Sequence, residues 1–309
     1  MTSSEIAMNP LVLTAVGACA LPHLGVIAAR GEDAAHFLHN QLTQDFALLD
    51  SQHARLAAFC NAKGRMQASM VGFKTSPQEV LLVLRADLLP QTLKRLSMFV
   101  LRAKVKLTEA SAEWRVAGRF TAHAEPLTPW QLTQNQRTWQ VGLYPAGGLA
   151  RQLCVLPTEE ALTDAPLDTQ DWLLGEVLSG VADVQAATFE AFVPQMLNYE
   201  SVDGVNFKKG CYPGQEVVAR SQFRGILKRR TYVVSSPVAL QAGEDIFHVS
   251  DNSQPAGQVA QAASHAQHGH WALVCLQTSF AQPDALYPVS SPDSRLQLHP
   301  LPYALRDDI

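Results

Sequence analysis

The chain has few cysteines, and none of them lie close together. Five cysteines are spread over 309 residues, and no Cys-x-x-Cys pair occurs. Such spacing supports neither a disulfide framework nor a zinc or iron–sulfur site built from one local loop. We therefore predict no metal site in the chain itself, so that any metal chemistry would have to involve a partner.

Long apolar runs are equally scarce. No segment approaches the roughly 18 apolar residues of a membrane-spanning helix, and the opening residues, Met-Thr-Ser-Ser-Glu, lack the basic region of a signal peptide. The apolar fraction of 47% and the charged fraction of 17% are those of an ordinary globular protein. These features predict a cytoplasmic protein without a membrane partner.

The first third of the chain predicts an α+β fold, in which helices cover an antiparallel sheet. The hydrophobic pattern indicates extended segments over 11–27, strands over 54–60, 65–73 and 80–84, and helices over 34–42 and 88–100. The turn-rich tetrapeptide Asn61-Ala62-Lys63-Gly64 predicts a hairpin between the strands on either side of it.

The remaining sequence predicts a division into domains, because a single core stops growing at roughly 250 to 300 residues. After about residue 110 we expect strands over 114–120 and 138–144, a polar loop over 121–137 between them, and a helix over 171–178. Beyond Arg230, frequent proline and glycine break the chain into short strands typical of a small β-barrel. We predict a core of two subdomains over 1–230, with a break near 110, and a β-barrel over 231–309.

A basic segment over residues 208–230 stands out in an otherwise acidic chain. It has seven cations and one anion, a net charge of +6, so the rest of the chain sums to −10. Such a segment can attract an anionic ligand to one place, although a solvated surface would give the same pattern. Arg220 and Arg224 are four residues apart and would share one face if a helix continues through them.

Cys211 lies at the start of this basic segment, next to Lys208 and Lys209. The following Tyr-Pro-Gly-Gln run suits a type II turn with glycine at its third position, and a helix can begin at Gln215. Neighbouring cations and a helix N-terminus favour the reactive thiolate form. The alternative is a structural cysteine that behaves as a small apolar residue. No histidine lies nearby in the sequence to act as a base, which argues against acyl transfer.

Two other features of the sequence carry less chemistry. The histidines His265, His268 and His270 lie in a glycine-containing turn without a nearby carboxylate, so we do not predict a metal-binding role for them. No RNA-recognition motif with paired aromatic residues is present.

Three separated stretches resemble a known family. Residues 206–220, Asn-Phe-Lys-Lys-Gly-Cys-Tyr-Pro-Gly-Gln-Glu-Val-Val-Ala-Arg, are similar to the signature of the YgfZ family of folate-binding proteins. Residues 192–199, Phe-Val-Pro-Gln-Met-Leu-Asn-Tyr, and residues 37–45, Phe-Leu-His-Asn-Gln-Leu-Thr-Gln-Asp, resemble two further motifs of that family. The similarity covers most of the chain.

This resemblance implies an aminomethyltransferase-like fold of two interleaved folate-binding α+β domains and a C-terminal β-barrel. It also implies tetrahydrofolate, or a derivative, as cofactor, and a role in the assembly or repair of iron–sulfur enzymes. The implied partners are folate, iron–sulfur client enzymes or assembly factors, and transfer RNA, since one client thiomodifies it. Carried onto this chain, the functionally important lysine and cysteine of the family are Lys209 and Cys211.

The sequence departs from the related glycine cleavage aminomethyltransferases at two places. The hairpin over residues 64–69 has no carboxylate where those enzymes have an acidic pair, and Leu178 stands where they hold the pterin with a glutamate. Glu176 is the candidate substitute for that glutamate. We therefore predict an accessory factor, with a one-carbon (aminomethyl) transferase and an RNA-binding factor as the alternatives.

Folate itself suggests how the basic segment would be used. Its rings favour an apolar cleft, and its glutamate tail carries carboxylates that cations can bind. The candidate cofactor-binding residues are Lys208, Gln215, Glu216, Arg220, Arg224 and Glu176.

Overall fold

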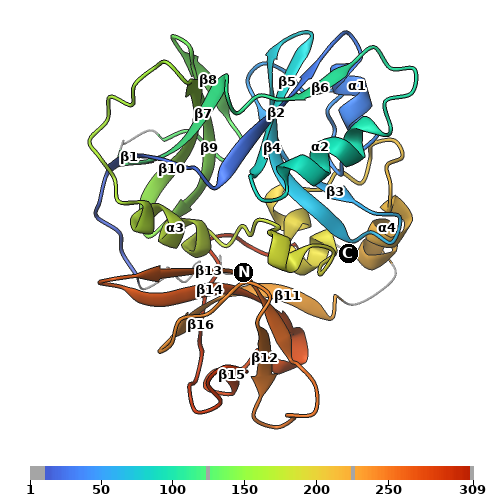
Figure 1. Ribbon diagram of the computed structural model, residues 1–309. Helices are drawn as coiled ribbons and strands as arrows, with labels where there is room; N and C mark the ends of the chain where they lie inside the picture. The colour runs from blue at the N-terminus through green and yellow to red at the C-terminus, as the bar shows by residue number, and fades with distance from the viewer. Residues whose placement is uncertain (1–10, 123–125, 224–226, 307–309) are drawn as a thin grey trace, which may run out of the picture.

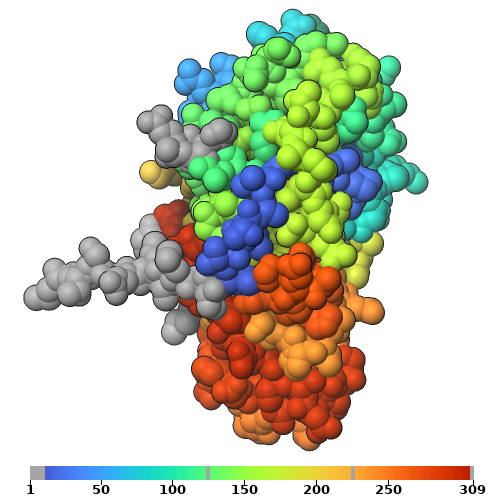
Figure 2. Space-filling model, turned by 90° about the vertical axis from the view of Figure 1, so that its left-hand side faces the viewer, coloured from blue at the N-terminus to red at the C-terminus, as the bar shows by residue number. Residues whose placement is uncertain are grey.

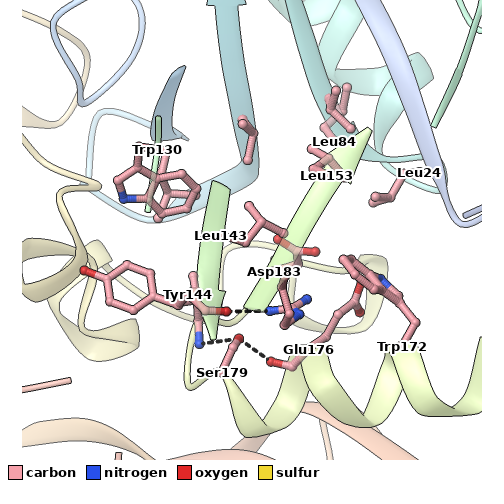
Figure 3. A pocket seen from close by; sticks show the side chains of 15 residues that line it. Leu24, Leu84, Trp130, Leu143, Tyr144, Leu153, Trp172, Glu176, Ser179 and Asp183 are labelled. Atoms are coloured by element: carbon pink, nitrogen blue, oxygen red, sulfur yellow. Dashed lines mark hydrogen bonds between the residues drawn. The ribbon is translucent and has the colours of Figure 1, made fainter. Parts of the chain in front are cut away.

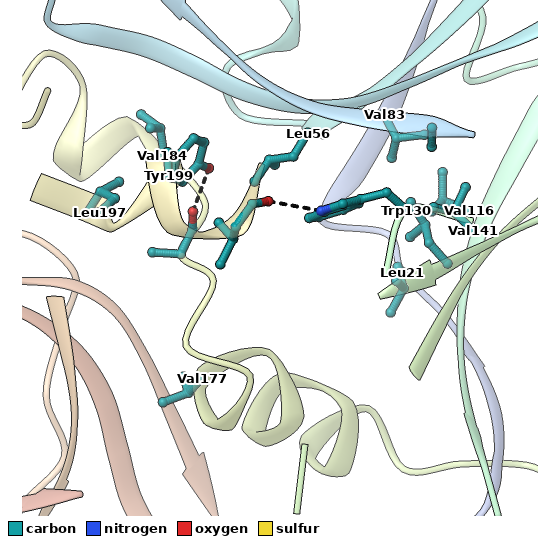
Figure 4. Close-up of a cluster of buried hydrophobic side chains, with 14 of the residues drawn as sticks. Leu21, Leu56, Val83, Val116, Trp130, Val141, Val177, Val184, Leu197 and Tyr199 are labelled. Atoms are coloured by element: carbon teal, nitrogen blue, oxygen red, sulfur yellow. Dashed lines mark hydrogen bonds between the residues drawn. The ribbon is translucent and has the colours of Figure 1, made fainter. Parts of the chain in front are cut away.

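The computed structural model describes residues 11–122, 126–223 and 227–306 and contains three antiparallel sheets (Figure 1). Two of the sheets lie side by side in the upper part of Figure 1, and the third lies below them. One hydrophobic core contains residues of all three sheets, among them Val26, Val116 and Val233. The three sheets therefore share a central core, part of which is drawn in Figure 4.

The first sheet has the order β1-β7-β10-β9-β8. Its strands are β1 (Gly17–Ala20), β7 (Trp114–Thr121), β8 (Leu132–Asn135), β9 (Thr138–Ala146) and β10 (Leu149–Pro157). The chain leaves this sheet after β1, builds the second sheet, and returns at β7. The predicted strands at 114–120 and 138–144 are confirmed, but the predicted loop is wrong where β8 pairs with β9.

The second sheet has the order β3-β4-β5-β2-β6. Its strands are β2 (Leu24–Arg30), β3 (Ala54–Cys60), β4 (Met66–Ser76), β5 (Glu79–Arg85) and β6 (Lys106–Glu109), and its helices are α1 (Ala34–His39) and α2 (Leu89–Ser97). Side chains alternate between the two faces of a strand, so Ile27 packs with α1 and α2 while Val26 faces the central core. The predicted hairpin and both predicted helices are confirmed.

The third sheet is formed by the C-terminal part of the chain, shown in orange and red in Figure 1 and in the lower part of Figure 2. Its order is β15-β12-β13-β14-β11-β16. Its strands are β11 (Arg229–Ser236), β12 (Asp245–His248), β13 (Gly257–His265), β14 (Gly269–Gln277), β15 (Leu286–Pro288) and β16 (Gln297–His299), with the short 3₁₀-helix η4 (Thr278–Phe280). In the described residues the edge strands β15 and β16 are not joined by a ladder, and the two edges meet only in an isolated bridge between Leu286 and Leu296. The predicted barrel is therefore a half-barrel sheet.

The chain between β10 of the first sheet and β11 of the third sheet contains short helices. They are α3 (Thr169–Leu178), the 3₁₀-helices η1 (Ala186–Thr188), η2 (Pro194–Leu197) and η3 (Tyr199–Val202), and α4 (Gln215–Phe223). The Asp168 side chain caps α3 by accepting the backbone N–H of Gln170 at 2.9 Å. Trp130 Nε1 donates to the Val202 carbonyl at 2.9 Å and so joins the first sheet to η3 (Figure 4).

None of the helices in the described parts of the chain is both long and apolar enough to cross a membrane.

Candidate functional site

Cys211 lies on the surface, in the turn that precedes α4. It is exposed and forms no disulfide within the described residues. The predicted turn is confirmed: Gly214 has a φ of 81°, and the Gln215 N–H donates to the Tyr212 carbonyl at 3.2 Å. A Cβ at Gly214 would lie 2.4 Å from the Asn61 carbonyl oxygen, so the hairpin of the second sheet fits closely against this turn.

Lys209 is buried, with 8% of its surface exposed, although it lies two residues before the exposed thiol. Its Nζ donates to the carbonyl oxygens of His39 at 2.5 Å and Leu42 at 3.0 Å, at the C-terminal end of α1. Nζ also lies 4.5 Å from the centre of the Tyr212 ring. Burial lowers the pKa of Lys209 to about 8, although the charge of Asp45 acts in the opposite direction.

The His39 imidazole lies close to residues 209–211, called the thiol segment below. The sequence did not predict this neighbour. Its Nε2 lies 3.4 Å from the position that a Cβ on Gly210 would occupy, and its Nδ1 lies 3.0 Å from Oδ1 of Asp45. No histidine lies near Cys211 in the sequence, but the contacts of α1 with Lys209 and Gly210 bring the His39 ring next to the residue that precedes the thiol. Burial alone would raise the pKa of Asp45, but the N–H of Leu48 and the His39 ring lower it.

The basic segment does not form one continuous surface. Arg230 is 6% exposed and pairs with Glu200 in the interior. The sequence count was therefore wrong to treat it as a surface cation. Arg220 is exposed and pairs with Glu216 at 2.8 Å within α4. Lys208 is exposed, Gln215 is half-buried at the start of α4, and Arg224 lies outside the described residues.

A cleft between the first two sheets is a second candidate site (Figure 3). It has an empty volume of about 600 Å³, including its opening to solvent, and three large aromatic side chains line it: Trp130, Tyr144 and Trp172. A lining of apolar and aromatic side chains with a few polar groups is typical of small-molecule sites, in which the polar groups orient the ligand. The polar residues that line this cleft are Arg151, Glu176, Ser179 and Asp183.

Glu176 lines the cleft, but other side chains already bind its carboxylate. Oε1 accepts from Trp172 Nε1 at 2.8 Å and lies 3.2 Å from Nε2 of His23, and Oε2 accepts from Gln261 at 2.9 Å. Burial alone would raise the pKa of Glu176, whereas the hydrogen bond and charge of His23 and the charge of Arg151 lower it. The carboxylate is therefore ionised and held within the protein.

Arg151 and Asp183 are less completely bonded. Arg151 is 5% exposed, its guanidinium carbon lies 4.5 Å from the centre of the Trp172 ring, and its Nε has no hydrogen-bond partner among the described residues. Burial lowers the pKa of Arg151 to about 10. Burial and then the charge of Glu176 raise the pKa of Asp183, whose Oδ1 lies 3.5 Å from the hydroxyl of Ser69. These are the polar groups best able to meet a ligand.

Sequence reasoning missed Asp183, Arg151 and His39. Asp183 follows Gly180 by three residues, so extending the comparison past residue 180 would have found a carboxylate beyond the helix. Arg151 belongs to β10 and would have been found only as an unexpected cation in an apolar strand.

The thiol segment and the cleft are separate places in the described structure. Neither Lys209 nor Cys211 is among the described residues that line the cleft. Gln44 lies next to Asp45 in the chain, and its side-chain Nε2 donates to the Asp203 carbonyl at 2.6 Å. The charge of Asp203 in turn acts on Tyr144 in the cleft, where burial and this charge raise the pKa of the phenol to about 12.

The histidine cluster also differs from the prediction. Nε2 of His265 lies 3.3 Å from Oδ1 of Asp171, so a carboxylate is nearby after all. However, no group of three or more histidine, cysteine or acidic side chains in the described part of the chain is arranged to hold a metal ion.

The fold places the chain in the aminomethyltransferase-like class. The structure is similar to the glycine cleavage system aminomethyltransferase T of Bartonella henselae, with a TM-score of 0.62 and 16% sequence identity, over 94% of this chain and 87% of that one. At this identity the similarity concerns the fold alone.

Sequence relatives are more specific. The chain is 28% identical to the tRNA-modifying protein YgfZ of Klebsiella pneumoniae, over 98% of this chain and 96% of that protein. It is 29% identical to the proteins of the same name from Yersinia pseudotuberculosis, over 98% and 96%, and Escherichia coli, over 90% and 90%. No protein-family model matches the chain. The resemblance to the YgfZ family is thus confirmed along nearly the whole chain.

Proposed function

We propose that the chain is a tetrahydrofolate-binding accessory protein with a role in transfer RNA modification. In finer detail, it supports the assembly or repair of iron–sulfur enzymes, including those that thiomodify transfer RNA. The aminomethyltransferase-like fold and the names of the curated relatives support the coarser statement. The observation that carries folate binding is the aromatic cleft with a guanidinium and a carboxyl group inside it.

The chemistry of the cleft fits a pterin ring. A pterin is flat and aromatic, so it can pack against indole and phenol rings such as those of Trp130 and Tyr144. One edge of the ring carries neighbouring N–H donors, which match a carboxylate, and a carbonyl oxygen, which matches a guanidinium. Asp183 and Arg151 supply these two groups, whereas Glu176 is already bonded to Trp172 and Gln261.

The proposal divides the chain as the sequence predicted. Two interleaved subdomains within residues 1–230 would form the folate-binding core, and residues 231–309 would form a small third domain. The glutamate tail of folate would extend toward exposed cations such as Lys208 and Arg220. Lys209 and Cys211 would then act on the iron–sulfur client enzyme rather than bind the pterin ring.

Two alternatives keep some support. An aminomethyl transferase is supported by the fold, and Asp183, which Ser69 of the hairpin contacts, could replace the acidic pair that the hairpin lacks. An RNA-binding factor is supported by the names of the relatives, although Arg230 is buried and Arg220 is paired, which reduces the free charge of residues 208–230.

Binding of a stable reduced folate, measured by calorimetry and tryptophan fluorescence, tests the cleft. We expect Asp183→Asn to weaken binding by about 10- to 150-fold, because a charge-assisted hydrogen bond contributes about 1.5–3 kcal/mol. The control Glu109→Gln removes an exposed carboxylate of β6 that does not line the cleft, and should leave the affinity unchanged. Equal folate affinities of Asp183→Asn and the native chain would contradict the assignment. A native chain that does not bind folate would contradict it as well.

Two further assays separate the alternatives. Turnover of labelled folate with amine donors would favour the transferase, and transfer RNA binding that weakens steeply with salt would favour the RNA-binding factor. In cells, Cys211→Ala should lower the activity of iron–sulfur enzymes if the accessory role is correct, and full complementation would leave the thiol without an essential role.

A further inference from the structure

We propose that His39, oriented by Asp45, is the base that accepts the thiol proton of Cys211, so that these residues form a site for a nucleophilic thiolate. This inference rests on the proposed role of Cys211 but does not depend on folate. It joins α1, the loop that follows it and the turn before α4.

The first step of the argument is the orientation of the imidazole. Nδ1 of His39 lies 3.0 Å from Oδ1 of Asp45, and the same carboxylate oxygen accepts the Leu48 N–H at 2.9 Å. An ionised carboxylate can only accept hydrogen bonds, so Nδ1 carries the proton in the neutral ring. The lone pair is then on Nε2, as in other sites where a carboxylate orients a histidine base.

The second step is where Nε2 points. It lies 3.4 Å from the position of a Cβ on Gly210, the residue directly before Cys211. Glycine at this position leaves the ring nitrogen open, because any side chain there would contact it. Consecutive Cα atoms are about 3.8 Å apart, so a rotation of the exposed Cys211 side chain can bring Sγ toward Nε2. Hydrogen bonds between such groups are often long before a substrate binds.

The third step is the charge around the site. The titratable groups that contact His39 are Asp45, His36 and Lys209: the His36 ring stacks on the His39 ring with centres 6.3 Å apart, and Nζ of Lys209 binds the His39 carbonyl. The charge of Cys211 acts in turn on Lys209. Proton transfer converts the thiol and the neutral imidazole into a thiolate and an imidazolium. Asp45 stabilises the imidazolium, and the nearby ammonium of Lys209 stabilises the thiolate.

Alkylation by iodoacetamide tests the proposal in the full chain. The thiolate displaces iodide, a sulfur–carbon bond forms as the carbon–iodine bond breaks, and the proton leaves through His39 to solvent. The other four cysteines are buried, so the reaction reports Cys211, with Cys211→Ala as the blank. We expect the native rate to reach its half-maximal value at a lower pH than the rate of the His39→Gln variant.

The variants identify the base. His39→Gln should move the midpoint upward and lower the rate at pH 7 by about tenfold for each pH unit of that movement. Asp45→Asn should have a smaller effect in the same direction, and His36→Gln, which changes an exposed neighbour, should leave the profile unchanged. A His39→Gln profile that overlaps the native one would overturn the proposal and leave Lys209 as the residue that controls the thiol.

A measurement on the unmodified protein does not depend on how the variants fold. The ¹⁵N chemical shifts of His39 identify which nitrogen carries the proton, and we expect Nδ1. Protonation at Nε2 would overturn the proposal, because no lone pair would then face Cys211. These outcomes are independent of the cellular test. Cys211 could be dispensable in cells and still transfer its proton to His39, and Cys211 could be essential in cells without His39 acting as its base.

Discussion

Nζ of Lys209 donates a hydrogen bond to the carbonyl oxygen of Leu42 at 3.0 Å, and so ties the thiol segment to the end of α1. The same ammonium also binds the His39 carbonyl, and it is almost fully buried. Lys209 therefore has a structural role, whatever its part in the chemistry of Cys211.

Lys209→Ala should destabilise the fold by about 1–3 kcal/mol, because buried carbonyl groups lose their donor. Urea denaturation measures this loss. Lys208→Ala removes the neighbouring exposed lysine and should change the free energy of unfolding by no more than about 0.5 kcal/mol. Equal effects of the two substitutions would show that the bonds to α1 contribute little.

Asp183 makes the stability depend on pH. Burial and the charge of Glu176 raise its pKa to about 6, so ionisation of this carboxyl destabilises the folded state. Its contribution to stability therefore falls as pH rises from about 4, the ordinary value for aspartate, to about 6.

Asp183→Asn removes this titration. The variant should be more stable than the native chain above pH 6, by on the order of 1 kcal/mol because the residue keeps some contact with solvent, and the difference should vanish below about pH 4. Urea unfolding at several pH values measures it. A constant difference across the range would mean that Asp183 does not titrate in this window.

Two arginines near the end of the basic segment allow a matched comparison. The side chains of Arg230 and Glu200, which form one ion pair, are 8% and 0% exposed. The side chains of Arg220 and Glu216, which form another, are 63% and 84% exposed. Removing one partner of a buried pair leaves an uncompensated charge and costs about 3–5 kcal/mol, while an exposed pair contributes about 0–1 kcal/mol.

Arg230→Ala should therefore lower the free energy of unfolding far more than Arg220→Ala. Denaturant unfolding of the two variants measures the contrast. Similar losses would contradict the burial of the Arg230 pair between η3 and the third sheet.

Local patterns predicted much of the fold. The strands that became β3 and β4 were correct because the hairpin between them is encoded by adjacent residues, from Asn61 to Gly64. β8 was missed because it is short and mostly polar, and only its pairing with β9 makes it a strand. The tight turn at Gly214 could also be predicted, since glycine is required where φ is 81°.

The sites depend on contacts between distant residues, which one sequence does not display. His39 and Gly210 meet only because α1 packs against the turn before α4. The burial of Arg230 depends on Glu200, from another element, so a count of charges along the chain placed it on the surface. Asp183 and Arg151 line one cleft because α3, which Asp183 follows, packs against the sheet that contains Arg151.

Two glycines with similar backbone angles test how closely the hairpin supports the Cys211 turn. Gly214 and Gly148 have φ values of 81° and 83°, but a Cβ at Gly214 would lie 2.4 Å from the Asn61 carbonyl, whereas a Cβ at Gly148 would meet no described atom within 4 Å. Gly148→Ala should cost about 1–2 kcal/mol, the strain of a left-handed alanine. Gly214→Ala should cost more, because the hairpin must also move.

Gly214→Ala should in addition change the alkylation rate of Cys211, since Cys211 directly precedes this turn. Gly148→Ala serves as the control and should leave that rate unchanged, because a Cβ there would meet no described atom within 4 Å. Thermal unfolding and alkylation of both variants measure the two effects. If Gly214→Ala lost stability without any change in alkylation, the hairpin would support the fold of α4 but would not set the geometry of the thiol.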